Sequence, residues 1–317
     1  MSLPYLQALP HGIFVIDTGF YRPLFDASYL LVECGRAAFI DSGTNFAVPR
    51  LLAALDELGL APDAVDFVIL THVHLDHAGG AGLLMQALPQ ATMLVHARGA
   101  RHMIDPQLLY QGALAVYGQA EMDSAYGSLG PVPAERVQAT HDGMTLQLAG
   151  RPLRFIDTPG HARHHHCIWD ERSRGWFTGD TFGLSYREFD TAQGAWVLPT
   201  STPVQFEPDA LRQSIARLLL SDPDWMYLTH FGRVGDVRRL AGLLFEQIDA
   251  MVALGLALKS APGRHEALKA GLTALYRAQL LRHGLTELEA VTGISGLALD
   301  IELNAQGLAI WLDRVAR

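Results

Sequence analysis

Short apolar runs alternate with longer stretches of helical periodicity over the first part of the chain. The first three runs cover residues 13–16, 29–32 and 37–40, are rich in branched side chains, and are separated by turn residues. This pattern predicts adjacent strands. Leucines at helical spacing predict a helix over residues 48–58, and the continuous apolar run 66–70 predicts a strand that is buried on both faces.

The middle of the chain continues with helix and strand patterns on either side of an insertion. Residues 82–88 favour a helix and residues 92–95 favour a strand. Residues 98–127 have a helical pattern and lie between core strands, so they form either a cover over a pocket or a plain surface insertion. Strand patterns return over residues 135–180, where the turn residues of 171–175 (ERSRG) predict a hairpin.

The last third of the chain is mostly helical in pattern. Residues 199–208 are rich in Pro and Thr and indicate a loop, which a predicted helix (209–220) and a predicted strand (225–228) follow. Helical periodicity then continues from residue 234 to the end. We therefore predict a layered α/β domain, with sheets inside and helices outside, in residues 1–233, and a helical extension in residues 234–317.

Composition and charge narrow the class of protein. Of the 317 residues, 49% are hydrophobic and 18% are charged, which is typical of a globular protein with a large core. The net charge of -9 disfavours nucleic-acid binding, so we expect a small-molecule substrate. Two cysteines, Cys34 and Cys167, argue against a disulfide scaffold. The N-terminus does not resemble a signal peptide, and no apolar run approaches the ~20 residues of a membrane span, so we expect a cytoplasmic protein with no membrane partner.

Four candidate metal ligands lie within six residues, directly after the predicted strand 66–70: His72, His74, Asp76 and His77. In an extended segment His72 and His74 point to the same side, because alternate residues share a face, so both can reach one metal ion. Asp76 and His77 follow where the chain should turn into a helix, so they can face a neighbouring position. Imidazole and carboxylate ligands suit zinc and related transition metals.

The segment THVHLDH (71–77) resembles the signature of the metallo-β-lactamase fold superfamily. Three further elements of that family follow in the same order: the turn Thr158-Pro159-Gly160-His161, the strand end Thr178-Gly179-Asp180 and the segment Leu228-Thr229-His230. The strand end at 40–43 (IDSG) is also similar, and the resemblance covers residues 13–232. It implies a four-layer αββα sandwich with the site at one edge between the two sheets.

This resemblance implies a role for each candidate ligand. One metal would be held by His72, His74 and His161, and a second by Asp76, His77 and His230, with Asp180 bridging the two. Asp76 would also orient the attacking water or manage its proton. Asp41 would orient a ligand, unless it only forms the turn before a glycine. The implied cofactors are two divalent metal ions, with zinc as the first choice and iron or manganese as alternatives.

Several other side chains are weaker candidates. His164, His165 and His166 cannot all face the metals, and His165 is the candidate among them to assist there; the alternative is that all three are strand-start histidines hydrogen-bonded to their neighbours. Tyr186 and Arg187 are candidate substrate contacts, with Arg187 able to pair with a carboxylate or a phosphate; the alternative is a solvated loop. The remaining histidines lack ligand spacing and are expected to be structural: His11, His96, His102, His141, His265 and His283.

The resemblance implies a reaction class and leaves the substrate open. We expect a dinuclear metal hydrolase, in which a metal-bridging hydroxide attacks a small ester, lactone or thioester. One alternative is a mononuclear iron dioxygenase that oxidises sulfur in a persulfide. Another is a regulatory or ligand-binding protein that retains the metals with little turnover. The C-terminal helices could close the pocket or form a homodimer contact.

Overall fold

The short apolar runs near the N-terminus form the first of two sheets. In the computed structural model, which describes residues 3–201 and 204–315, this sheet has seven strands that follow one another in chain order. The first four are antiparallel neighbours, and the last three continue in parallel. The strands are β1 (Leu6–Leu9), β2 (Ile13–Asp17), β3 (Ala27–Glu33), β4 (Arg36–Ile40), β5 (Val65–Leu70), β6 (Thr92–His96) and β7 (Val137–Thr140).

The second sheet has six strands and contains the predicted hairpin. Strands β8 to β11 are antiparallel neighbours, and the turn between β10 and β11 is the one predicted at residues 171–175. Strand β12 then pairs with β11 in parallel. The strands are β8 (Thr145–Leu148), β9 (Arg151–Asp157), β10 (His166–Asp170), β11 (Gly175–Gly179), β12 (Trp225–Leu228) and β13 (Gly232–Val234).

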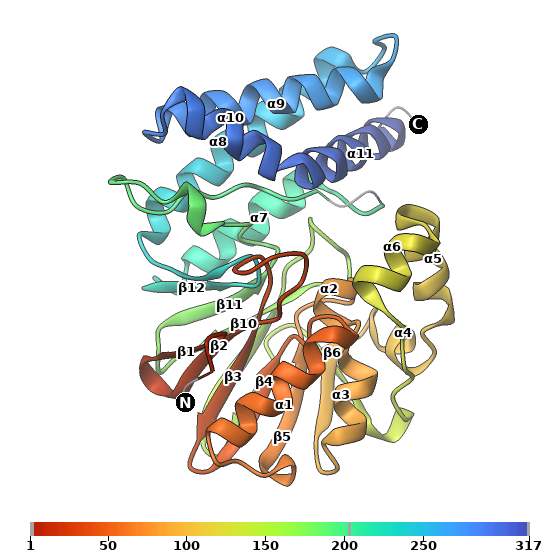
Figure 1. The fold of residues 1–317 in the computed structure, drawn as a ribbon, viewed down its shortest axis with the longest axis vertical. Coiled ribbons are helices and arrows are strands. Elements are labelled where there is room, and N and C mark those ends of the chain that lie inside the picture. The colour runs from red at the N-terminus through yellow and green to blue at the C-terminus, as the bar shows by residue number, and fades with distance from the viewer. Residues whose placement is uncertain (1–2, 202–203, 316–317) are drawn as a thin grey trace. The chain divides into compact units, whose positions relative to one another are not determined.

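Successive residues of the central strands face two different layers. Ile40 and Ile69 pack in one core with Phe155, Phe177 and Tyr227 of the second sheet. Their neighbours in β4 and β5 point the other way, because side chains alternate along a strand. That opposite face is covered by helices α1 (Val48–Glu57) and α3 (Ala81–Ala87), as Figure 1 shows. Val68, Ile69 and Leu70 are therefore buried on both faces of the sheet, as predicted for this run, whereas Asp66 and Phe67 are only partly buried.

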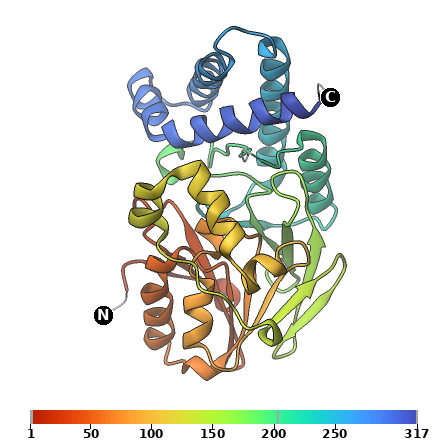
Figure 2. The ribbon, with the colours of Figure 1, turned by 90° about the vertical axis from the view of Figure 1, so that its right-hand side faces the viewer.

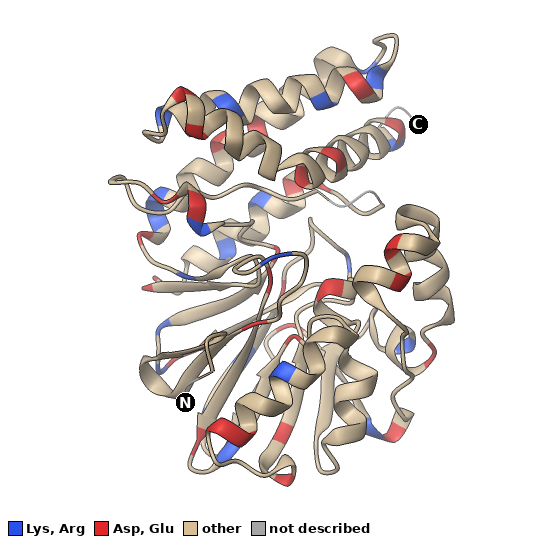
Figure 3. Ribbon diagram, in the orientation of Figure 1, with Lys and Arg blue, Asp and Glu red and all other residues tan. Residues whose placement is uncertain are grey.

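The predicted helical insertion consists of short helices. These are α4 (Ala100–Ile104), α5 (Gln107–Tyr117), α6 (Gln119–Glu121) and the π-helical turn Met122–Tyr126. Helix α5 has no charged residue (Figure 3) and buries none of its side chains, and Leu108 is 66% exposed. An uncharged, exposed helix is unusual, because surface helices ordinarily carry a polar face.

The chain divides into two units, each with its own internal packing. The first unit, residues 1–157, 164–179 and 224–233, contains the strands and helices described above. The second unit consists of residues 158–163, 180–223 and 234–317. Its helices are α7 (Pro208–Leu219), α8 (Val237–Leu258), α9 (Arg264–Arg282), α10 (Glu287–Gly296) and α11 (Ala298–Val315).

The C-terminal helices of the second unit pack on one another. Helix α11, dark blue in Figure 2, lies across α8, α9 and α10. Among the described residues α8 is the one helix with the length and composition of a membrane span, with a mean hydropathy of 1.6. One such helix does not establish a span, and Leu240, Leu244, Ile248 and Met251 give α8 a buried stripe inside this unit. Residues 237–315 are thus helical, as predicted.

Candidate metal centre

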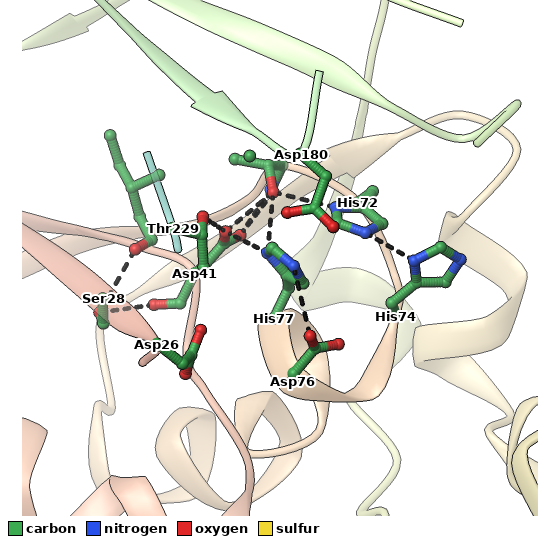
Figure 4. A network of polar contacts seen from close by, with 12 residues as sticks. Asp26, Ser28, Asp41, His72, His74, Asp76, His77, Asp180 and Thr229 are labelled. Atoms are coloured by element: carbon green, nitrogen blue, oxygen red, sulfur yellow. Dashed lines mark hydrogen bonds and ion pairs between the residues drawn. The ribbon is translucent and has the colours of Figure 1, made fainter. Parts of the chain in front are cut away.

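His72 and His74 leave the end of β5 on the same side of the chain. His72 Nε2 lies 2.8 Å from His74 Nδ1, so the two rings face each other (Figure 4). His72 is fully buried, and its Nδ1 lies 3.2 Å from the Thr71 hydroxyl. The next residues form the short helix α2 (Leu75–Ala78), which carries Asp76 and His77.

Asp76, His77 and His230 come together as one group of candidate ligands. One ligand atom from each lies within 4.8 Å of those of the other two. Asp76 Oδ2 lies 3.7 Å from His77 Nε2 and 3.3 Å from His230 Nε2. His230 follows β12, about 150 residues beyond α2 in sequence, so this part of the site depends on the fold of the first unit.

Asp41 holds the outer nitrogen of His77. His77 Nδ1 donates to Asp41 Oδ2 at 2.8 Å, and Asp41 is 1% exposed (Figure 4). The carboxylate is itself fixed by the Thr71 backbone N–H at 2.7 Å and by the Thr229 hydroxyl at 3.1 Å. Asp41 therefore has the position of the ligand-orienting residue that we predicted, because a carboxylate on Nδ1 turns Nε2 toward the centre.

His230 is oriented in the same way by a backbone carbonyl. Its Nδ1 lies 2.9 Å from the carbonyl oxygen of Phe25. A carbonyl only accepts hydrogen bonds, so Nδ1 carries a proton, and in the neutral ring the lone pair is then on Nε2. In their neutral form, His77 and His230 both turn the lone pair of Nε2 toward the carboxylate of Asp76.

Two further predicted ligands, His161 and Asp180, lie together in the second unit. His161 Nε2 is 3.3 Å from Asp180 Oδ2, and His161 Nδ1 donates to the Thr200 carbonyl at 3.3 Å. The turn that carries His161 needs its glycine, since a Cβ at Gly160 would lie 2.2 Å from the backbone nitrogen of Leu211 in α7. This close approach to α7 fixes the turn.

The three consecutive histidines face different surroundings. The His165 ring stacks on His72, with centroids 4.7 Å apart, and His164 meets His74 edge-on at 5.4 Å. His166 Nδ1 lies 2.7 Å from the Thr140 hydroxyl, and burial lowers its pKa to about 3. His165 thus lies against a candidate ligand, whereas His166 bonds to strand β7.

Tyr186 and Arg187 have partners within the second unit. Tyr186 is buried, and its hydroxyl lies 3.1 Å from Asp300 Oδ1. Arg187 donates to the Ser185 carbonyl at 2.6 Å and lies 3.3 Å from Asp190. These contacts account for both side chains without a substrate, so their predicted substrate role stays a prediction. Three of the histidines expected to be structural also have local partners: His96 with Asp157, His265 with Glu302 and His283 with Gly194.

A buried carboxyl that the sequence did not point to lies beside this group. Asp26 has no exposed surface, and its Oδ2 accepts a hydrogen bond from Thr18 at 2.6 Å. Burial raises the pKa of Asp26 to about 7; the charges of His230 and His77 oppose this rise and that of Asp76 adds to it. No motif marks Asp26, because its importance comes from burial and from residues that are distant in sequence.

Aromatic side chains surround one side of the same group. Phe25 meets the His230 ring edge-on at 5.6 Å, and ring contacts of 4.2–6.0 Å continue from it through the loop before β3 to the helical insertion. Tyr21 also bonds to Glu121 of α6, and it is 46% exposed. We call these side chains the aromatic cluster: Phe20, Tyr21, Phe25, Tyr117 and Tyr126.

The donor set fits a divalent transition metal. Because the Nδ1 atoms of His77, His230 and His161 donate outward, each neutral ring turns a lone pair toward a carboxylate oxygen. A lone pair and a carboxylate 3.3 Å apart repel each other unless a cation or a proton lies between them. Imidazoles fixed by an outer acceptor and combined with carboxylates are the typical surroundings of zinc and related ions.

Known proteins with similar sequences include two enzymes. The chain is 30% identical over 195 residues to a hydroxyacylglutathione hydrolase of Xanthomonas euvesicatoria, covering 57% of this chain and 61% of that protein. It is 29% identical over 157 residues to the atrochrysone carboxyl ACP thioesterase of Aspergillus fumigatus, covering 49% of this chain and 39% of that protein. The chain thus spans less than two thirds of the length of either relative.

A solved structure and a family model extend the comparison to the fold. A metallo-beta-lactamase family protein of Thermus thermophilus superposes with a TM-score of 0.66 at 23% identity, covering 98% of this chain and 95% of that one. This likeness confirms the predicted fold, including the helical C-terminal segment. The family model described as the metallo-beta-lactamase superfamily matches residues 21–230, more than half of the chain. The protein therefore belongs to the metallo-beta-lactamase superfamily.

Proposed function

We propose that this protein is a hydrolase of small esters or thioesters that uses two divalent metal ions. The observation that carries the proposal is the group of Asp76, His77 and His230, in which Asp41 and a backbone carbonyl fix both histidines with Nε2 facing one carboxylate oxygen. The two enzymes to which the chain is similar are named as a hydrolase and a thioesterase, which supports hydrolysis as the reaction class.

In this proposal the ligands divide as the family pattern implies. Asp76, His77 and His230 would hold one ion. His72, His74 and His161 would hold the other, and Asp180 would contribute to both. The paired nitrogens of His72 and His74 and the paired His161 and Asp180 support this division. Zinc is the ion that the mixture of imidazole and carboxylate favours first.

In the proposed reaction, the bound ions and the residues around them would have different roles. Bound divalent ions would polarise the substrate carbonyl and lower the pKa of a bound water toward neutrality. Asp76 is partly exposed, with 23% of its side chain accessible, so this carboxylate can orient the attacking water and take its proton. Asp41 keeps His77 in the tautomer that leaves Nε2 unprotonated.

The aromatic cluster supports a substrate with an apolar acyl or aryl group. Phe25 touches the ring of His230, so a substrate bound at this group of ligands would lie beside aromatic surface. Tyr126 packs against Phe20 and Tyr117, with ring centroids 5.4 and 5.0 Å away. It lies near the ligands, because burial first and also the charge of the Asp76 carboxylate raise the pKa of its hydroxyl. An acyl chain on this surface would lose contact with water, which favours binding.

The proposal is tested by hydrolysis assays on one preparation with and without metal. We expect the zinc-loaded protein to cleave 4-nitrophenyl esters and acyl thioesters, and the metal-free protein to lose this activity until zinc is restored. Asp76→Asn keeps the size of the side chain but removes its basicity. It should lower kcat by a larger factor than it lowers the amount of metal bound per chain. Hydrolysis that persists unchanged after complete metal removal would contradict the proposal.

A further inference from the structure

The C-terminal helices hold one peptide group of the loop that carries the acceptor for His161. That group joins Thr200 and Ser201. Its carbonyl accepts from His161 Nδ1 at 3.3 Å, and its N–H donates to Asn304 Oδ1 of α11 at 2.6 Å. The C=O and N–H of a trans peptide point in opposite directions. Asn304 and His161 therefore form hydrogen bonds to opposite sides of one rigid, planar peptide group.

Asn304 makes a second contact that fixes its own orientation. Its Nδ2 donates to the carbonyl of Pro199 at 3.1 Å and to the hydroxyl of Tyr276 in α9 at 2.9 Å. The side-chain amide thus spans residues 199 and 201, on both sides of Thr200. A flipped amide would place oxygen against the Pro199 carbonyl and nitrogen against the Ser201 N–H, so the observed orientation is the one that satisfies both.

The surroundings of Asn304 exclude a merely solvated asparagine. Asn304 is 1% exposed, and Ser201 and Tyr276 are fully buried. A buried amide inside a helix is costly unless its hydrogen bonds are made, and asparagine is a poor helix former. Helix α11 also comes so close to the loop that a Cβ at Gly307 would lie 2.6 Å from Ser201 Oγ. The hydrogen bonds of Asn304 and the close packing at Gly307 both restrict the loop to one position.

We infer that Asn304 is a positioning residue for the metal ligand His161, acting through the Thr200–Ser201 peptide. The Thr200 carbonyl keeps the proton of His161 on Nδ1 and so leaves the lone pair of Nε2 toward Asp180. Because the Ser201 N–H is bonded at the other end, the peptide dipole is fixed and strengthened as an acceptor. The helical extension is then part of the support of the metal centre. This inference needs His161 to be a ligand, as in the proposed function, but it needs no particular substrate.

A matched pair of variants separates positioning from general stability. Asn304→Leu removes the amide at nearly constant volume. Gln247→Leu removes another fully buried amide, from α8, whose Nε2 donates to the Val197 carbonyl at 2.7 Å in the same stretch of chain. Only the first variant releases the peptide that bonds His161. Full-length proteins would be stripped of metal and titrated with Zn²⁺ or Co²⁺ against a chromophoric chelator, with the melting temperature of the metal-free form measured in parallel.

We expect both variants to lower the melting temperature and only Asn304→Leu to weaken one metal-binding step, by roughly 10- to 100-fold, with a changed Co²⁺ absorption spectrum. Equal metal affinities for the two variants would overturn the inference. If Asn304→Leu does not fold, Gly307→Ala serves instead, because it displaces Ser201 and leaves Asn304 in place; unchanged metal binding there would also overturn it. These titrations contain no substrate. A protein that binds metal as expected but hydrolyses nothing would refute the proposed function and leave this inference standing.

Discussion

Asp41 Oδ2 accepts a hydrogen bond from His77 Nδ1 at 2.8 Å, and both side chains are buried at the end of the first sheet. The same carboxylate receives the backbone N–H of Thr71 and the hydroxyl of Thr229, so it links three separate segments of the first unit. Because Asp41 is held in place by the fold, it determines that Nδ1 is the nitrogen of His77 that carries a proton. A ligand whose tautomer is set in this way does not need to reorganise when a metal binds.

Replacing Asp41 by asparagine should weaken metal binding. The amide can still accept from Thr71, but its NH₂ group cannot accept the proton of His77 Nδ1, so the required tautomer is lost. We expect the affinity of one metal site to fall by roughly 10- to 100-fold, measured by competition with a chelator. Ser28→Ala is the control, since Ser28 Oγ donates only to the backbone carbonyls of Asp41 and Ile40. The same affinity in both variants would show that the carboxylate does not act on His77.

Asp180→Ala should remove metal and activity together. In the proposed centre Asp180 would contribute to both ions. The residues that directly follow it carry no carboxylate that could take its place. The comparison is Asp190→Ala, which deletes a carboxylate of the same loop that pairs with Arg187. Metal content is measured by elemental analysis and hydrolysis by an ester assay, both on each of the two variants. Normal metal content with full activity in Asp180→Ala would refute the bridging role.

The stability of the metal-free protein should depend on the charge of Asp26. Its folded-state pKa of about 7 lies above the value of about 4 expected for an unfolded chain. Between these two pH values the folded state binds more protons, so stability falls as the pH rises through the window. Asp26→Asn mimics the protonated acid and should remove this loss.

The measurement is the free energy of unfolding of wild type and Asp26→Asn from pH 4 to pH 7. The variant should gain on the wild type as the pH rises, by at most about 1.4 kcal/mol per pH unit. Comparing the two proteins cancels the titration of the shared histidines that do not interact with Asp26, whereas the charges of His77 and His230 are coupled to it. A difference that stays constant over the window would mean that Asp26 is ionised throughout.

Shortening Tyr21 should change the preference for acyl chains. Tyr21 is the most exposed member of the aromatic cluster, at 46%, so its ring is accessible to a substrate. We expect Tyr21→Ala to lower kcat/KM for a 4-nitrophenyl octanoate by about tenfold, which corresponds to ~1.4 kcal/mol of lost apolar contact, and to leave the acetate nearly unchanged. Leu256→Ala, at an exposed leucine of α8, is the control. Parallel losses on both esters would place the effect on the metal centre instead.

Much of the fold follows from local patterns. The run 66–70 is continuous and apolar and becomes β5, buried between α-helices and the second sheet; the helix predicted at 209–220 is α7 within one residue. The strands β1 and β13 were not predicted. They have only four and three residues, too few for an alternation of apolar and polar residues to stand out in the sequence, and each depends on a neighbouring strand for its pairing.

The candidate site also contains some residues that the sequence marks and others that only the fold identifies. The spacing of His72, His74, Asp76 and His77 marks them in the sequence, because four candidate ligands gather within six residues. The groups that orient His230 and His161 leave no local pattern, because the carbonyls of Phe25 and Thr200 are backbone atoms that any residue type could supply. Asp26 and Asn304 likewise look like ordinary polar residues until burial and their distant partners are known.

The central claim is that this chain binds two divalent metal ions at its predicted ligands, and its most direct test is metal content. The protein would be purified without added metal or chelator, and the metal bound per chain determined by elemental analysis. We predict two ions per chain, mainly zinc. A single iron per chain would contradict the two-metal hydrolase and favour oxidation of a sulfur substrate, and a chain without bound metal that cannot be loaded would contradict the metal centre itself.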